Sequence, residues 1–135
     1  MRVGRGAAIV NDMNPTWLLT FMSAVATLVG VLAIVRPVAF LESKGATVSA
    51  AAVVWMREVG VLILAQGLTC FLLRNQALSP ALRAFLLGAA VTQFGLLPIE
   101  LVAYWRGSLT KLSGVLPNSV LHVVLGGALL YCALA

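Results

Sequence analysis

The chain has 135 residues, of which 61% are hydrophobic and only 10% are charged. Soluble globular domains carry about 25% charged residues, and a soluble domain of this size could not bury so much apolar surface. The composition therefore excludes a soluble globular protein and predicts an integral membrane protein. The net charge of +5 does not predict nucleic-acid binding, because the basic residues occur singly at segment ends and form no basic stripe.

Four apolar segments are each long enough to cross a membrane, for which an α-helix needs about 20 residues. They cover approximately residues 16–35, 51–73, 81–105 and 119–135, after a polar N-terminal segment at 1–15. We predict a single integral membrane domain over 1–135, folded as an all-α, four-helix transmembrane bundle. Because the number of spans is even, both termini should lie on the same side of the membrane, here named side A.

The first span begins after Pro15, which suits a helix start, and Trp17 is expected at the membrane interface. Its apolar run continues to Val35, which favours an uncleaved span over a signal peptide. A short interfacial helix is expected around Val38 to Leu41. The loop lysines and arginines are equally numerous on both sides, so they favour neither orientation.

Four ionisable side chains lie well inside the spans, and a helical rise of ~1.5 Å per residue places all of them toward the opposite side, side B. They are Arg57, Glu58, Glu100 and His122. Charges in a bilayer are costly and normally face the bundle and pair with one another. We predict an interhelical ion pair between Arg57 and Glu100, with Glu58 directed toward His122 or water. Tyr104 shares a helix face with Glu100.

Two glutamines should lie near the middle of the membrane on neighbouring spans. The same helical rise places Gln66 and Gln93 at similar depths, so we predict a hydrogen bond between them. Pro98 removes one helix hydrogen bond between Gln93 and Glu100. These polar groups have two interpretations, which the sequence leaves open. They either fix the helix packing or snorkel to the interface, or they line a pocket that handles a ligand or a proton.

No metal site is predicted, because a lone histidine and two cysteines without C-x-x-C spacing do not supply a ligand set. Cys70 and Cys132 both fall inside apolar spans, where free cysteine usually behaves as a small apolar residue.

The second span contains the pattern R-x-x-G-x-x-x-L-x-x-G, formed by Arg57, Gly60, Leu64 and Gly67, and the last span contains "LHVVLGGALL" around His122. Over residues 50–135 the chain resembles the DoxX-like superfamily of small bacterial four-helix membrane proteins, although in that family the arginine commonly opens the first span. The resemblance implies a location in the bacterial inner membrane. It also implies partners among the subunits of quinone-linked oxidoreductases.

Three functions fit these observations. The chain is an accessory or structural subunit of a membrane complex, or it binds a hydrophobic molecule such as a quinone or a lipid through the side-B polar cluster. The alternative is a membrane-embedded enzyme with acid–base or quinone-linked chemistry on a lipid-like substrate. A non-enzymatic role is favoured, because no motif specifies a reaction, and no cofactor is predicted. The expected partners are membrane lipids, together with larger subunits or further copies of the chain.

Overall fold

The computed structural model describes residues 15–135, which form five α-helices and no strands. The helices are α1 (Thr16–Val35), α2 (Pro37–Ser43), α3 (Ala50–Leu73), α4 (Pro80–Trp105) and α5 (Leu112–Leu134). All but α2 are long and apolar enough to cross a membrane. This confirms the predicted all-α membrane bundle, and α2 confirms the short helix expected after the first span. The predicted polar segment lies outside the described residues, except for Pro15.

Serine side chains cap the starts of two of the long helices. The Ser49 hydroxyl accepts a hydrogen bond from Ala52 N (3.1 Å) at the start of α3, and Ser79 caps α4 in the same way. Such side-chain caps satisfy backbone donors that lack a partner within the helix. The fourth span begins earlier than the predicted residue 119, because α5 continues through Pro117. Pro117 stands in the second turn of α5, so the backbone hydrogen bond that it removes lies close to the start of the helix.

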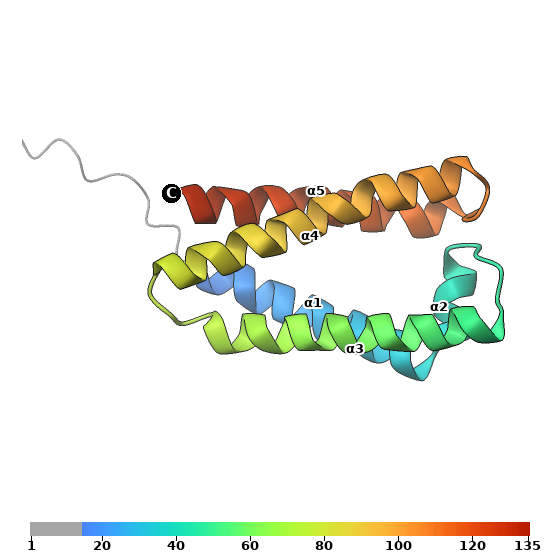
Figure 1. Ribbon diagram of the computed structural model, residues 1–135, viewed down its shortest axis with the longest axis horizontal. Helices are drawn as coiled ribbons and strands as arrows, with labels where there is room; N and C mark the ends of the chain where they lie inside the picture. The colour runs from blue at the N-terminus through green and yellow to red at the C-terminus, as the bar shows by residue number, and fades with distance from the viewer. Residues whose placement is uncertain (1–14) are drawn as a thin grey trace, which may run out of the picture.

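The long helices associate as two antiparallel pairs, α1 with α3 and α4 with α5 (Figure 1). The contact between the two pairs is much sparser than the contact within each pair. Consecutive helices α3 and α4 therefore belong to different pairs, and this separation decides which polar side chains meet. Helix α1 begins and α5 ends at the same end of the molecule (Figure 1), as the even number of spans requires.

Glycines allow α1 and α3 to approach closely. A Cβ added to Gly30 would lie 2.7 Å from Leu64 Cγ and 2.9 Å from the backbone oxygen of Gly60. A Cβ on Gly67 would lie 3.1 Å from the Ala26 Cβ. Small residues at such crossings let helix backbones pack directly against each other in lipid.

The two pairs share a hydrophobic core at the side-A end of the molecule. Buried residues of all four long helices form it: Leu19 and Met22 of α1, Cys70 of α3, Leu82, Leu86, Ala89 and Ala90 of α4, and Leu125, Leu129, Cys132 and Ala133 of α5. At the same end, Arg83 Nη1 donates a hydrogen bond to Ala133 O (2.7 Å). The core thus joins the pairs where the chain enters α1 and leaves α5.

At the side-B end, the pairs are joined by a loop contact between residues 42–45, which close α2, and residues 110–114, which lead into α5. Thr110 Oγ1 donates to Gly45 O (3.1 Å), Lys111 N donates to Lys44 O (3.2 Å), and Lys111 Nζ donates to Glu42 O (2.8 Å). Gly45 has φ +70°, and a Cβ there would lie 2.8 Å from Lys111 N. The loop contact therefore depends on a glycine.

Candidate functional site

Polar side chains of α4 and α5 face one another in the half of the bundle toward side B, and we name them the polar seam. The seam comprises Gln93 and Glu100 of α4 and Asn118, Ser119 and His122 of α5. Residues three, four or seven apart share one face of a helix. The spacing of each set therefore directs it toward the partner helix.

Glu100 is held from two elements. Its Oε1 forms an ion pair with Lys44 Nζ, which reaches in from the end of α2, and its Oε2 accepts a hydrogen bond from Ser119 Oγ (3.4 Å). The side chains of Lys44 and Glu100 are only 17% and 12% exposed. This charge pair links the α1–α3 half of the molecule to the α4–α5 half.

His122 uses both ring nitrogens. Its Nδ1 lies 2.5 Å from Gln93 Oε1, and its Nε2 lies 2.9 Å from Asn118 Nδ2. The amide oxygen can only accept and the amide nitrogen can only donate. The arrangement therefore suits a neutral imidazole that carries its proton on Nδ1 and accepts at Nε2.

The polar seam joins α4 to α5 through hydrogen bonds between side chains. Within residues 15–135, no buried side-chain nitrogen or oxygen lacks a hydrogen-bond partner. Hydrogen bonds of this kind between side chains help fix the register of two helices in lipid. Of the two interpretations of the polar groups, the geometry therefore supports helix packing for Glu100 and His122.

The predicted ion pair between Arg57 and Glu100 is wrong, because Lys44 occupies that place. Of the two alternatives predicted for Glu58, His122 or water, the contact with His122 is wrong, because His122 is bonded to Gln93 and Asn118. Arg57 and Glu58 are exposed on α3, whose dense packing is with α1, whereas α4 packs mainly on α5. The prediction used only the depth of each side chain in the membrane, which is similar for Arg57, Glu58 and Glu100. The pairing of α3 with α1 and of α4 with α5 separates Arg57 and Glu58 from Glu100.

The predicted hydrogen bond between Gln66 and Gln93 is likewise absent from the described residues, since Gln93 Oε1 is bonded to His122. Gln66 is half-buried on α3. Tyr104 is 37% exposed and takes no part in the polar seam.

Sequence reasoning missed three members of this arrangement. Asn118 and Ser119 could have been found, because they stand four and three residues before His122 on one helix face. No sequence pattern pointed to Lys44, because it lies in a turn and helical spacing cannot relate a turn residue to a face of α4.

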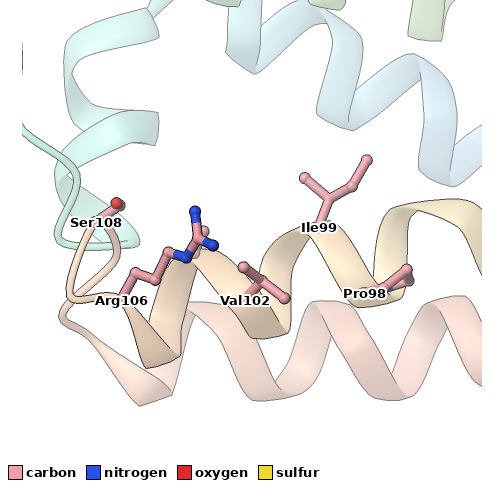
Figure 2. A pocket seen from close by; sticks show the side chains of 6 residues that line it. Pro98, Ile99, Val102, Arg106 and Ser108 are labelled. Atoms are coloured by element: carbon pink, nitrogen blue, oxygen red, sulfur yellow. The ribbon is translucent and has the colours of Figure 1, made fainter.

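A groove of about 480 Å³ lies on α4 beside the polar seam. Its lining is Pro98, Ile99, Val102, Ala103, Arg106 and Ser108. Figure 2 shows Arg106 and Ser108 toward one end of the groove and Ile99 and Pro98 toward the other. A second groove of about 500 Å³ lies between α1 and α3, and no charged residue lines it. The first groove thus combines an apolar floor with a cation.

Arg106 stands where α4 ends, at the level of the membrane interface. Its neighbour Trp105 is 85% exposed, and exposed tryptophans mark the headgroup region of membrane proteins. The Arg106 side chain is exposed. The groove therefore runs from the headgroup level toward the apolar interior.

No cluster of three potential metal ligands occurs within residues 15–135. Cys70 and Cys132 are buried free thiols. No family model, no curated protein and no solved structure matches this chain.

Proposed function

We propose that this small integral membrane protein binds one lipid-like molecule in the α4 groove, with an apolar chain of that molecule lying along Ile99 and Val102. The observation that carries the proposal is the groove itself, whose floor is apolar and whose outer end reaches the interface at Arg106.

The size of the groove suits part of an amphiphile. From Pro98 to Arg106 the helix rises roughly 12 Å at ~1.5 Å per residue, about the length of a short alkyl segment. Ligand sites in proteins are typically 300–1,000 Å³ and largely apolar, with few polar groups, and the groove at about 480 Å³ falls in this range.

The polar seam supports this proposal as a scaffold. Glu100 is bonded to Lys44 and Ser119, so α4 is held against α5 at the level of the groove. In this function, Glu100 and His122 position the groove wall and do not touch the ligand. Acid–base chemistry on a lipid has less support, because Glu100 and His122 would first have to give up their bonds to Lys44, Ser119, Gln93 and Asn118.

The test is native mass spectrometry of the protein released from bilayers of phosphatidylcholine and phosphatidylglycerol. The wild-type chain should retain one lipid-sized adduct after mild activation. Val102→Trp fills the groove and should remove the adduct. Val91→Trp is the matched control, because Val91 is 72% exposed on the same helix and does not line the groove.

A wild-type chain without a retained adduct would contradict the proposal. Equal retention by the Val102→Trp variant would contradict it as well. Circular dichroism of all three proteins checks that the helices are intact.

A second candidate function, a subunit of a membrane complex, is favoured by one feature of α4. Ala84, Gly88, Thr92 and Gly95 are exposed, and a Cβ added at Gly88 or Gly95 would have no neighbour within 4 Å. Small residues let another helix approach closely. The DoxX-like resemblance would place such a partner among quinone-linked oxidoreductase subunits. Co-purification that Gly88→Leu abolishes, while Val91→Leu preserves it, would support this function.

A further inference from the structure

Two polar side chains stand at the outer end of the α4 groove, whose floor is otherwise apolar. Arg106 and Ser108 both line it, and Gly107 between them has φ +75°. This left-handed turn, which glycine adopts readily, brings the arginine and the hydroxyl to the same end of the groove (Figure 2).

Arg106 differs from the two lysines near this end, Lys44 and Lys111. Lys44 is engaged with Glu100, and Lys111 donates to Glu42 O. Within the described part of the chain, the Arg106 guanidinium has no hydrogen-bond or ion-pair partner. A guanidinium has five N–H donors arranged to match phosphate oxygens, and a serine hydroxyl can add a further donor.

We infer that the groove selects a phosphate-bearing, anionic membrane lipid, with the phosphate held by Arg106 and Ser108 and an acyl chain lying on Val102 and Ile99. This inference rests on the proposed function and names its ligand class. Charge complementarity carries it, because a cation without an acidic partner stands at headgroup level directly above an apolar floor.

The geometry argues for a lipid and not for a free phosphate. The lining between Arg106 and Pro98 is aliphatic, and a soluble anion would leave that surface unused. A lipid satisfies both ends of the groove at once.

The experiment compares two lipids with identical acyl chains, phosphatidylglycerol and a diacylglycerol that lacks the phosphate, mixed in equal amounts in phosphatidylcholine nanodiscs. Native mass spectrometry measures the ratio of the two adducts. The wild-type chain should favour phosphatidylglycerol roughly fivefold, the effect of one solvent-accessible charged contact.

Arg106→Gln should bring this ratio close to one while the diacylglycerol adduct persists, and Ser108→Ala should reduce the ratio by a smaller factor. Arg36→Gln is the matched control, because Arg36 is an exposed arginine near the same membrane face and does not line the groove. This control should keep the wild-type ratio.

The outcomes separate the two proposals. Binding of neither lipid would overturn the proposed function and this inference together. Equal binding of both lipids by the wild-type chain would overturn only the inference. An equal loss of preference in Arg106→Gln and Arg36→Gln would also overturn the inference, because it would reduce the effect to general surface charge.

Discussion

Lys44 and Glu100 form an ion pair across the side-B end of the bundle, joining the end of α2 to the side-B end of the polar seam. Their side chains are mostly shielded, at 17% and 12% exposure. The pair stands beside the loop contact between residues 42–45 and 110–114. It is the one ion pair, within residues 15–135, between two helix pairs that share their hydrophobic core at the opposite end.

Replacing Glu100 with glutamine should lower the free energy of unfolding by about 1 to 3 kcal/mol. This is less than the 3–5 kcal/mol typical of a fully buried broken pair, because Lys44 lies in a loop and can reach water. Unfolding in mixed micelles of dodecylmaltoside and sodium dodecyl sulfate measures the change. The double variant with Lys44→Met isolates the coupling between the two residues.

The matched control for this substitution is Glu58→Gln, because Glu58 is exposed on α3 and makes no contact with the polar seam. Its effect should remain within about 0.5 kcal/mol. A larger loss at Glu58 than at Glu100 would contradict the assignment of Lys44 as the partner of Glu100.

Replacing Gln93 with leucine should cost about 0.6 to 1.7 kcal/mol, the usual size of a side-chain hydrogen bond between membrane helices. The substitution leaves His122 Nδ1 without its acceptor. A cycle with His122→Phe, measured by the same unfolding assay, should show positive coupling between Gln93 and His122. Gln66→Leu should show no coupling to Gln93, and coupling there would restore the glutamine pair that the sequence had predicted.

Gly30→Ala should destabilise the protein by about 1 to 3 kcal/mol, the range for overpacked interiors. The added methyl group would lie 2.9 Å from the Gly60 carbonyl oxygen, and a backbone atom cannot move away as a side chain can. Gly88→Ala is the control, because its Cβ meets open space. If thermal unfolding in detergent gave equal losses for the two variants, the close approach of α1 and α3 would be refuted.

Gly45→Ala and Gly107→Ala should differ, although both glycines have positive φ values of +70° and +75°. Each alanine pays about 1 to 2 kcal/mol for a left-handed conformation. Only the methyl group at position 45 also meets Thr110 and Lys111, so Gly45→Ala should lose about 1 kcal/mol more. Equal unfolding free energies for the two variants would show that the loop contact adds no stability.

The sequence was sufficient for the spans and for three of the five residues of the polar seam, Gln93, Glu100 and His122. The length and hydrophobicity of residues 16–35 and of the other three segments predicted four spans, because the thickness of the bilayer sets the length that a span requires. The structure has four helices long and apolar enough to cross a membrane. Glu100 and His122 were correctly expected toward the same membrane face, because depth follows from the helical rise. The predicted partners were wrong, because depth does not say which helices are neighbours.

The glycines also show the difference between what the sequence spacing indicates and what the fold decides. Gly60 and Gly67, which stand seven apart, do mark the packed face of α3, against Gly30 and Ala26 of α1. Gly88 follows an equivalent spacing on α4 yet meets nothing within 4 Å. A small residue permits a close approach, but whether a helix comes near is decided by the fold.

By itself, the sequence determined that the chain lies in a membrane, where its helices run, and which leaflet receives most of its intramembrane charge. These properties follow from the cost of exposing polar groups to lipid, which is fixed residue by residue. Only the tertiary structure decided that α3 pairs with α1 and α4 with α5. Arg57 is left exposed on α3, and the loop contact between residues 42–45 and 110–114 holds Lys44 beside Glu100, because an ion pair forms between side chains whose backbones are already close together.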